Sequence, residues 1–431
     1  MKRSIDEISS KNKPVTNDLK SQHNFKQLDT STSGGSKNRE LESRSEPSNE
    51  SNPGKSECAE NMLSSDILQI QPISRFNGKF PFFRQPMEVG CFSLDRDRKL
   101  YLDTRMLKYL YDTREISVRF DLQHGFDVFE KRDDDVKERL NNLMQWILGM
   151  KKHFQLDPKE VDENGSPKLR SLNTDFIAWR GHITKILCTP YEQREGWMMA
   201  VTLFHGTYYI SEVETKENEA RRKNMSDREK EMTYWGYKFE QYMTSVDGRQ
   251  EPNTNVPVNN SEAYCSVIRT RLNKHSLIYS GEVDCCVNDP NLRPPANYIE
   301  LKTNRILYAP NNKRNFHRYK LLKWWAQSFL IGIPTVIGGF RDDEGNVLQL
   351  ERFSTFRMPE IARQERSWSA SVCVNFCDYF LNYVKSQVTR DDPRVVYLFE
   401  RKPGSDEITY TIEEDPVHHF MPEWYIKCFT Q

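Results

Sequence analysis

The sequence predicts a single large domain of the α/β class (α+β in detail), in which mixed β-sheets are flanked by helices. Apolar residues recur at intervals of two in some segments and of three to four in others, as is typical of strands and amphipathic helices respectively. These segments follow one another without a regular strand–helix–strand repeat, which favours a mixed sheet over a doubly wound one. The aromatic-rich part of the chain, residues 74–431, is long enough for one large domain.

The N-terminal segment, residues 1–73, is predicted to be a disordered tail, and residues 74–431 are predicted to form the folded domain. The first 60 residues contain twelve Ser, one aromatic residue, and ten acidic against ten basic residues. Such a segment buries too little apolar surface to offset the entropy lost on ordering. Within it, Lys2-Arg3 and Lys11-Asn12-Lys13 loosely resemble a bipartite import signal. We therefore expect a nuclear location, with the cytoplasm left open as a second one.

Composition excludes several classes of protein. The 62 Lys and Arg residues balance 62 Asp and Glu residues, so nucleic acid would have to be bound at a defined site and not through a globally basic chain. No apolar run approaches the roughly 20 residues of a membrane span, and no secretory signal pattern opens the chain. The nine Cys residues lack CxxC spacing, which argues against disulfides or a zinc ribbon and for a reducing compartment. None of the nine His residues forms an HxH or HExxH motif, which argues against a zinc hydrolase.

The elements of the domain can be followed in order along the chain. An amphipathic helix is predicted over Val136–Phe154, behind the acidic residues Asp133–Asp135, because apolar residues recur there at spacings of three and four. Trp197–Phe204 and Tyr208–Val213 are predicted to form a hairpin that turns at His205-Gly206. The later elements are expected to be strands at Tyr264–Arg271, Leu277–Val287 and Asn297–Thr303, a helix at Phe316–Leu330, a strand at Pro334–Phe340, a hairpin turn at Asp342–Gly345 and a long helix at Ser369–Val388.

Two short motifs place acidic residues at strand spacing. Glu282 and Asp284 are two residues apart on one predicted strand, so their side chains should point to the same sheet face. Glu300 and Lys302 repeat this arrangement on the next strand, and the fifteen residues between the two motifs let the strands pair. Glu240, in an aromatic-rich helical segment upstream, is a fourth candidate carboxylate. Carboxylates on one face repel each other, and oxygen-only ligation suits Mg²⁺ or Mn²⁺, so a divalent cation site is predicted here.

An acidic pair followed by an acid–lysine pair is typical of a metal-dependent phosphodiesterase. Carboxylates hold one or two metal ions there, and the lysine positions the water or the phosphate. The alternative is an exposed strand face of alternating charges, and the spacing alone leaves both interpretations open. Glu212 and Glu214 have the same spacing, but no acid–lysine strand follows them, so they are expected to form a solvated face.

Basic residues near these motifs are candidates for phosphate contacts. Lys320, Lys323 and Gln327 fall on one face of the helix predicted after the acid–lysine strand, and they could face the same cleft. Arg180, which follows a Trp, is a further candidate because a guanidinium binds two phosphate oxygens at once. An ordinary amphipathic helix and a structural arginine are the alternatives.

Longer segments of the chain resemble the DXO family of decapping and exoribonuclease proteins, and its animal members more than the fungal ones. The resemblance runs from about Phe80 to Thr430 and does not extend to the tail. It rests on the segments Cys91–Asp95, Trp179–His182 with Thr189–Glu192, Gly236–Tyr242, Ala263–Val267, Ser280–Asp284, Glu300–Thr303 and Leu321–Leu330.

The resemblance implies a core similar to that of PD-(D/E)xK nucleases and an enzyme that removes defective 5′ ends from RNA. Such an enzyme hydrolyses 5′-triphosphates, incomplete caps and nucleotide-cofactor caps such as NAD, and then degrades the RNA from 5′ to 3′. Two Mg²⁺ or Mn²⁺ ions and a single-stranded RNA with a 5′ end are implied as cofactor and substrate. A separate 5′→3′ exoribonuclease is a further expected partner.

The resemblance also implies roles for individual residues. The metal ions would be held by Glu240, Glu282, Asp284, Glu300 and the Leu301 carbonyl. The reacting phosphate or water would be contacted by Lys302 and Gln327. The other substrate-binding positions would be Arg98, Glu138, Trp179, Arg180, Gly181 and Cys265.

Two further functions stay open at the level of sequence. The chain could be a non-catalytic partner or activator of a separate 5′→3′ exoribonuclease, because a docking surface leaves no motif in the sequence. It could also be a DNA endonuclease built on the same core, because the carboxylate motifs do not distinguish DNA from RNA.

Overall fold

The computed structural model of the chain describes residues 66–113, 117–414 and 417–430. Residues 1–65 of the predicted tail therefore lie outside the described residues. Its last part differs from the prediction, because strand β1 (Ile67–Gln69) pairs with strand β19 (Glu407–Glu413). Leu68 and Ile70 are fully buried in this part of the chain. The predicted boundary at residue 74 is thus wrong, and the reason is a strand partner more than 330 residues away in the sequence.

A ten-stranded mixed sheet forms one half of the domain. Its strand order is β1-β19-β18-β9-β10-β8-β13-β12-β2-β3. The strands not yet given span Val396–Arg401 (β18), Trp197–Phe204 (β9), Thr207–Val213 (β10), Phe176–Trp179 (β8), His275–Glu282 (β13), Ala263–Leu272 (β12), Met87–Leu94 (β2) and Leu100–Tyr101 (β3). The predicted hairpin is confirmed by the antiparallel pair β9–β10, whose turn residues His205 and Gly206 have φ of 48° and 72°. Positive φ at both turn residues matches the right-handed twist of the strands they join.

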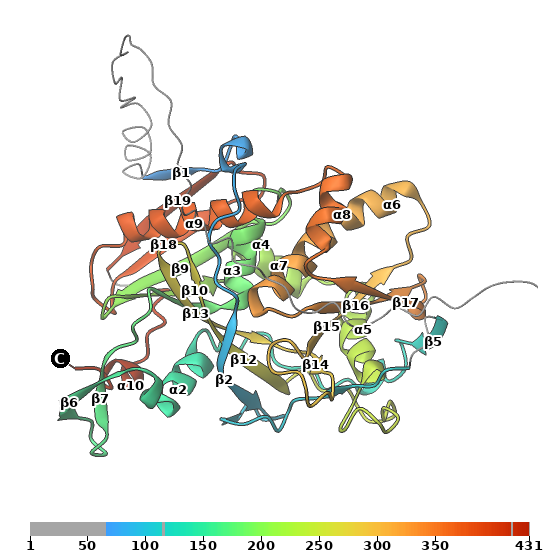
Figure 1. Cartoon of the computed structure of the whole chain (residues 1–431), viewed down its shortest axis with the longest axis horizontal. Helices are drawn as coiled ribbons and strands as arrows, with labels where there is room; N and C mark the ends of the chain where they lie inside the picture. The colour runs from blue at the N-terminus through green and yellow to red at the C-terminus, as the bar shows by residue number, and fades with distance from the viewer. Residues whose placement is uncertain (1–65, 114–116, 415–416, 431) are drawn as a thin grey trace, which may run out of the picture. The chain divides into compact units, whose positions relative to one another are not determined.

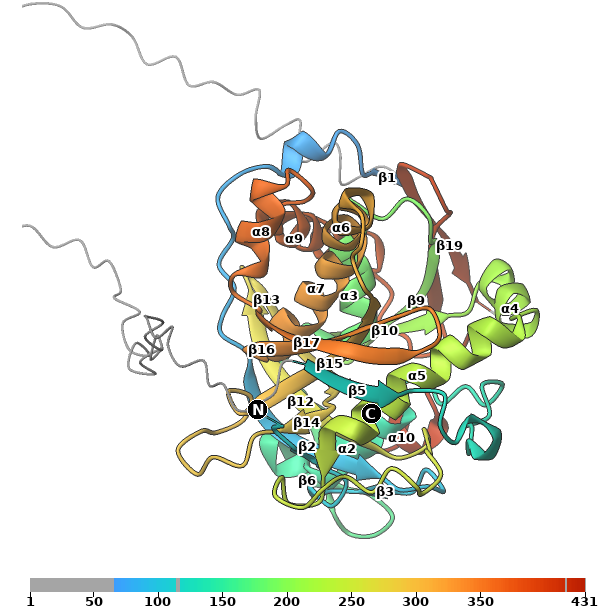
Figure 2. The ribbon, with the colours of Figure 1, turned by 90° about the vertical axis from the view of Figure 1, so that its right-hand side faces the viewer.

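Helices cover both faces of this sheet (Figures 1 and 2). Helices α3 (Arg180–Cys188), α7 (Leu321–Ile331) and α9 (Ala370–Gln387) share the largest apolar cluster with one face. Helices α2 (Asn141–Gly149) and α10 (Glu423–Ile426) share a second cluster with the opposite face. Burial of both faces explains why the sequences of the central strands are nearly continuous apolar runs.

A second, seven-stranded mixed sheet has the order β11-β4-β14-β15-β16-β17-β5. Helix α5 (Asp227–Met243) packs on one face of it through a third apolar cluster, and a capping box of Ser226 and Glu229 begins that helix. The predicted turn at residues 342–345 is confirmed, since the strands on either side of it pair antiparallel. The strands span Thr244–Ser245 (β11), Tyr109–Leu110 (β4), Cys285–Cys286 (β14), Tyr298–Arg305 (β15), Thr335–Arg341 (β16), Asn346–Ser354 (β17) and Ser117–Asp121 (β5).

Two predicted elements differ from the structure. The helix predicted over residues 136–154 is shorter, because α2 covers only residues 141–149 and Val136 is 56% exposed. The strand predicted over residues 277–287 is split, because β13 ends at Glu282 in the first sheet and β14 begins at Cys285 in the second. The other predicted strands and helices of the second half are confirmed to within about two residues at most ends.

The described elements also include shorter or peripheral ones. They are the two-stranded sheet of β6 (Gln155–Val161) and β7 (Pro167–Ser171), helices α4 (Lys216–Lys223), α6 (Pro310–Asn315) and α8 (Met358–Gln364), 3₁₀ turns at Ile73–Phe76, Phe126–Val128 and Lys151–His153, and a π-helical turn at Phe316–Lys320. Among the described residues, no helix is both long enough and apolar enough to cross a membrane.

Candidate active site

The crossing from the first sheet to the second positions the first acidic pair. Glu282 is the last residue of β13, and Asp284 directly precedes β14. Between them, the buried Val283 donates its N–H to the Tyr264 carbonyl at 3.0 Å. Glu282 and Asp284 therefore lie at the junction of the two sheets, and the prediction that they share one face of a single strand is wrong in that detail.

The second motif lies on the neighbouring strand β15. Ile299 and Leu301 belong to the apolar cluster under α5, so Glu300 and Lys302 point to the opposite face of the sheet, as predicted. Cys285 of β14 pairs with Ile299, which brings the two motifs together. The link is direct, because an oxygen of Asp284 accepts the Leu301 N–H at 2.6 Å.

Two positive charges flank Glu300, whose side chain is 1% exposed. The Lys302 ammonium lies 2.6 Å from one carboxylate oxygen, and the Arg180 guanidinium lies 3.8 Å from the same oxygen. Burial acts to raise the pKa of Glu300, but the charges of Lys302 and Arg180 outweigh burial and hold this pKa below its usual value. Glu300 is therefore held as a carboxylate between two cations.

In the other three carboxylates, burial and nearby negative charges outweigh the nearby cations, so their pKa values are raised. Glu240 lies in the last turn of α5, and burial together with the charges of Asp284 and Glu282 raises its pKa well above the usual value. The pKa values of Asp284 and Glu282 are also raised, in each case mainly by burial. Carboxylates that raise one another's pKa lie close together in a region of low dielectric, and a cation bound among them would relieve the repulsion.

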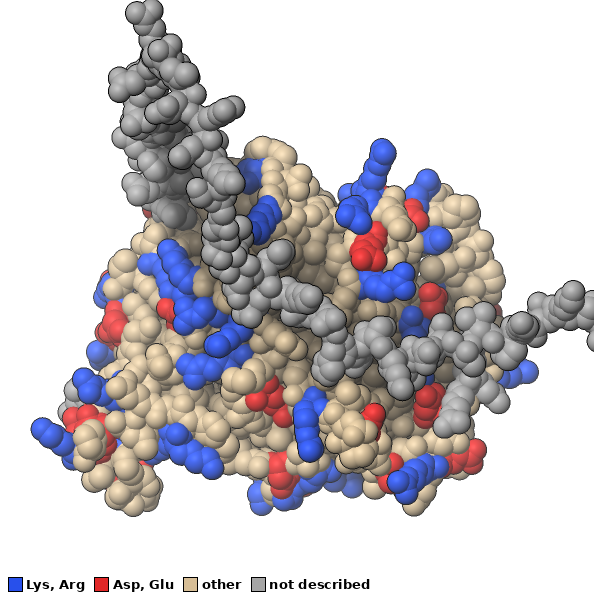
Figure 3. Space-filling view, in the orientation of Figure 1, with Lys and Arg blue, Asp and Glu red and all other residues tan. Residues whose placement is uncertain are grey.

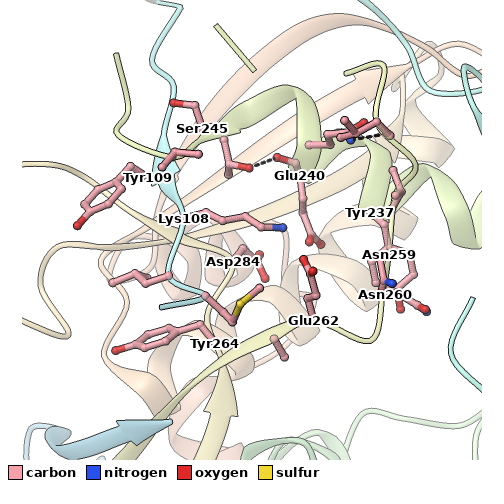
Figure 4. Close-up of a pocket in the computed structure, with 18 of the residues that line it drawn as sticks. Lys108, Tyr109, Tyr237, Glu240, Ser245, Asn259, Asn260, Glu262, Tyr264 and Asp284 are labelled. Carbon is pink, nitrogen blue, oxygen red and sulfur yellow. Dashed lines mark hydrogen bonds between the residues drawn. The ribbon is translucent and has the colours of Figure 1, made fainter. Parts of the chain in front are cut away.

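A cavity of about 770 Å³ opens onto this cluster and is lined by Glu240, Glu282 and Asp284. Figure 4 shows Glu240 and Asp284 pointing toward each other across it. Glu282 is exposed to water in spite of its deep position, because its side chain faces this cavity. The acids are thus both enclosed by protein and accessible to a ligand.

Arg180 joins the substrate-binding candidates to the acidic cluster. It is the first residue of α3, is 8% exposed, and donates from Nη2 to the Glu282 carbonyl at 3.1 Å. Gly281 makes this position possible, because a Cβ there would lie 2.9 Å from the Arg180 Cβ. The neighbouring Trp179 donates its indole N–H to the Arg139 carbonyl at 2.6 Å. At Gly181, in contrast, an added Cβ would meet no atom of another element within 4 Å, so the start of α3 is open on that side.

Arg98 and Glu138 form a charged pair beside the same cluster. Two hydrogen bonds of 2.7 and 2.6 Å join them, and Arg98 also donates to the Ser261 carbonyl at 2.6 Å. The pKa of Arg98 is raised in spite of burial, by Glu138 first and to a smaller degree by Glu282. Cys265 pairs in register with Glu282 and is 4% exposed, so it lies next to the acids, although it does not line the cavity.

Two predicted phosphate contacts lie elsewhere. Lys323 is ion-paired with Glu192 at 3.0 Å and with Glu195 at 2.8 Å, so its charge is already neutralised. Lys320 is exposed beside Arg341. Neither lysine lines the cavity, and the prediction that they face the cleft is wrong. Gln327 is half-buried on α7 and does not line the cavity either.

The comparison pair Glu212 and Glu214 does not line the cavity, and both side chains are half-buried in ion pairs where a solvated face was predicted. Glu212 forms an ion pair with Lys185, and Glu214 pairs with Arg222 at 2.9 Å and with Lys137 at 2.9 Å. The hydrogen bond from Arg222 lowers the pKa of Glu214 to about 2. Equal spacing in sequence thus yields a neutralised surface pair here and an acidic cluster at Glu282 and Asp284.

The sequence interpretation missed several charged residues of the cavity, among them Lys108 and Glu262. Figure 4 shows the Lys108 ammonium beside Glu240 and Asp284, with Glu262 across the cavity. Lys108 precedes a strand of only two residues, β4. A single lysine before so short a strand forms no pattern that could have predicted this position.

The side chains as placed do not form a ready metal cage. Within the described residues, no group of three or more His, Cys, Asp or Glu side chains is spaced to hold a metal ion together. The chemistry of the donors nevertheless fits a hard divalent cation, because they are all oxygens. Both Glu300 carboxylate oxygens are buried without a hydrogen bond of good geometry, in spite of the nearby Lys302 ammonium.

Comparison with known proteins adds independent evidence. The family described as RAI1 like PD-(D/E)XK nuclease matches residues 84–426. A decapping and exoribonuclease protein of Xenopus laevis is 45% identical over 364 residues, which cover 82% of this chain and 88% of that protein. The structure of Candida albicans Rai1 in complex with pU5-Mn²⁺ is similar with a TM-score of 0.68 and 26% identity, covering 81% of this chain and 96% of that one. The structure of Scheffersomyces stipitis Rai1 with (3′-NADP)⁺ and a calcium ion gives a TM-score of 0.66 and 26% identity, covering 78% of this chain and 90% of that one.

Proposed function

Because the chain belongs to the RAI1-like PD-(D/E)XK nuclease family, we propose that its acidic cavity processes the 5′ ends of RNA. The chain is a hydrolase with a mixed α/β nuclease core, as the sequence predicted. Its reactions are the removal of incomplete caps, NAD-type caps and 5′-triphosphates, followed by 5′→3′ degradation. The relatives' complexes with a 5′-phosphorylated oligonucleotide and with a nicotinamide dinucleotide support both types of substrate.

The observation that carries this proposal is the meeting of three carboxylates, Glu240, Glu282 and Asp284, at one cavity, with the buried Glu300 near enough for its charge to raise the pKa of Asp284 and of Glu282. Two ions, Mg²⁺ or Mn²⁺, would be held by Glu240, Glu282, Asp284, Glu300 and the Leu301 carbonyl. When bound, such ions activate water and stabilise negative charge on the phosphoryl group. Relatives have been solved with Mn²⁺ or with a calcium ion, which supports a divalent cation at this site.

The chain's own cations would act on the reacting phosphate. Lys302 and Arg180 stand beside Glu300, so a small movement lets either one donate to a phosphate oxygen. Arg180 presents a planar guanidinium with several donor N–H groups. Lys302 keeps its charge because Glu300 and Asp284 raise its pKa against the effect of burial. Both side chains therefore offset developing negative charge without taking part in proton transfer. Gln327 would reach this centre only by moving from its place on α7.

The substrate would lie along the start of α3 and the β2–β12 side of the cavity. Trp179 and Gly181 flank Arg180, and the open space at Gly181 lets a phosphate approach the backbone N–H groups of the helix N-terminus. Arg98, Glu138 and Cys265 do not line the cavity. They are proposed as substrate contacts because Cys265 pairs with Glu282 and Arg98, which is bound to Glu138, lies near Glu282.

Charge and enclosure together favour action from a free 5′ end. On the face that Figure 3 shows, Lys and Arg side chains gather toward the left and are mixed with Asp and Glu side chains elsewhere, while the whole sequence has as many acidic as basic residues. We therefore propose that the terminal phosphates are bound mainly at the cavity, beside the acids and cations described above. Of the basic residues predicted to contact phosphate, Arg180 and Lys302 remain, because both lie beside Glu300. Lys323 is ion-paired with Glu192 and Glu195, and Lys320 is exposed beside Arg341.

The test is an assay on one RNA that carries in turn a 5′-triphosphate, an unmethylated cap, a methylated cap, an NAD cap and a 5′-monophosphate. We expect activity with Mg²⁺ or Mn²⁺, its loss in excess EDTA, and its recovery when metal is returned. Asp284→Ala should abolish end removal and degradation together, because one site is proposed for both. Glu212→Gln is the matched control, since it removes an acid of the same spacing from a surface ion pair. Full activity in EDTA would refute the metal site, and loss of only one activity would require two sites.

A purely non-catalytic role is not favoured, because all four acidic positions and the lysine are present in the chain and three of the acids line an accessible cavity. Binding to a separate 5′→3′ exoribonuclease remains a proposal that co-purification of the two proteins would test. A nuclear location is proposed from Lys2-Arg3 and Lys11–Lys13, which lie outside the described residues. Imaging of a variant with these lysines and arginine replaced would test it, and unchanged nuclear signal would refute the import role.

A further inference from the structure

The sheet order brackets the acidic cluster between two lysines. In the seven-stranded sheet, β14 lies between β4 and β15, and Asp284 directly precedes β14. Lys108 directly precedes β4, and Lys302 lies on β15. The backbone of Lys108 is held in place, because its carbonyl accepts the Cys286 N–H at 3.0 Å and Tyr109 pairs with Cys286. The two lysines therefore approach Asp284 from the two neighbouring strands.

The two lysines differ in how their charges are compensated. Lys302 lies 2.6 Å from a Glu300 oxygen. Lys108 forms no ion pair within 4 Å in the part of the chain that the structure describes, although it lines the same cavity. Its ammonium nevertheless acts on the acids, since its charge opposes the rise in pKa of Glu240 and of Glu282 that burial causes. Figure 4 shows the ammonium pointing into the space beside Glu240 and Asp284.

A lysine that served only to neutralise the acids would be expected at ion-pair distance from one of them. Lys108 is instead exposed to the cavity on a flexible four-carbon stem, with three donor hydrogens that no described carboxylate occupies. An ammonium in this setting is suited to an anionic ligand that enters the cavity. A phosphate group fits, because it offers several acceptor oxygens to the ammonium. It also carries negative charge, with which Lys108 can form the ion pair that it does not form with a described carboxylate.

We propose that Lys108 is a further substrate-binding residue, which contacts a phosphate of the RNA 5′ end on the β4 side of Asp284, while Lys302 acts on the β15 side. This inference rests on the proposed function. Two cations on opposite sides of the acids would hold the phosphates of the substrate in line with the reacting centre. The competing interpretation is that Lys108 only weakens the repulsion among the acids when no metal ion is bound.

The experiment compares the full-length wild-type protein with Lys108→Met, Lys108→Arg and Lys152→Met. Lys152 is the matched control, because it is an exposed lysine on the turn after α2 and does not line the cavity. Three quantities are measured for each protein: kcat/KM on a 5′-monophosphate RNA, the inhibition constant of AMP, and the Mn²⁺ concentration that gives half-maximal activity.

For Lys108→Met we expect kcat/KM to fall at least tenfold and the inhibition constant of AMP to rise by a similar factor. Saturating Mn²⁺ should not restore either value. Lys108→Arg should keep AMP inhibition within about threefold of wild type, because it retains the charge, and Lys152→Met should match wild type. If Lys108→Met does not fold, as judged by its melting curve, Lys108→Gln replaces it.

Two results would overturn the proposal. One is a Lys108→Met protein whose kcat/KM and AMP inhibition stay within twofold of wild type. The other is a loss that disappears at saturating Mn²⁺, which would assign Lys108 to the acids alone. A wild-type protein that is inactive on every 5′ end would instead refute the proposed function. AMP binding measured by calorimetry on the same proteins would then still decide the role of Lys108.

Discussion

Replacing Gly281 by Ala should disturb the active site through packing alone. A Cβ at this position would lie 2.7 Å from the Ile331 Cδ1, 2.9 Å from the Arg180 Cβ and 3.0 Å from the Arg180 Nε. The Ile331 methyl is the end of a flexible side chain and can move. The Arg180 Cβ is attached to the helix backbone, so relief there requires the start of α3 to shift.

The expected size of the effect follows from these contacts. Overpacking of a well-packed core costs about 1–3 kcal/mol, so the free energy of unfolding should fall by about that amount. The shift also moves the guanidinium that donates to the Glu282 carbonyl at 3.1 Å. Small misplacements of a positioning group lower rates strongly, and we expect kcat/KM on 5′-monophosphate RNA to fall by about tenfold or more.

The assay combines urea denaturation with steady-state kinetics on the same preparations. Gly236→Ala is the matched control, because Gly236 lies within helix α5 and an added Cβ there would meet no atom of another element within 4 Å. That change should raise the free energy of unfolding by about 0.5–1 kcal/mol, as expected for Gly to Ala in a helix. Gly281→Ala with wild-type stability and wild-type kcat/KM would refute the packing argument.

Three further predictions follow from the site and the core. Glu300→Gln leaves the charges of Lys302 and Arg180 uncompensated, so the unfolding free energy of the metal-free protein should fall by about 3 kcal/mol, as measured by urea denaturation. A variant as stable as the wild type would contradict the role of Glu300 between these two cations. Burial lowers the pKa of His182 to about 4 from its usual value of 6.5, so its contribution to stability is present above pH 6.5 and is lost as the pH falls toward 4. Between pH 6.5 and pH 4 the free energy of unfolding of the wild type should fall by about 3 kcal/mol more than that of His182→Gln. Parallel curves of unfolding free energy against pH for the two proteins would disprove the prediction. Circular single-stranded RNA should resist degradation while its linear form with a 5′-monophosphate is consumed, and efficient cleavage of the circle would revive the endonuclease interpretation.

The chemistry of the site could be predicted from the sequence because its signal is local. Glu300 and Lys302 are two residues apart on one strand, and strand geometry alone requires that they share a face. Apolar neighbours on both sides of this pair indicated that the strand is buried. The neutral surface pair Glu212 and Glu214 was separated from the acidic cluster by the same local reasoning, since no acid–lysine strand follows it.

Contacts between distant segments decided the rest. Lys323 has helical spacing suited to a phosphate contact, but Glu192 and Glu195 arrive from a loop about 130 residues earlier and neutralise it. Strand β13 ends at Glu282 because the next residues pair with a different sheet, and no local period records that crossing. Lys108 enters the cavity only because β4 pairs beside β14. Spacing along the chain determines which side chains share a face. Which charged groups then surround each side chain depends on strands and loops that only the folded chain brings together.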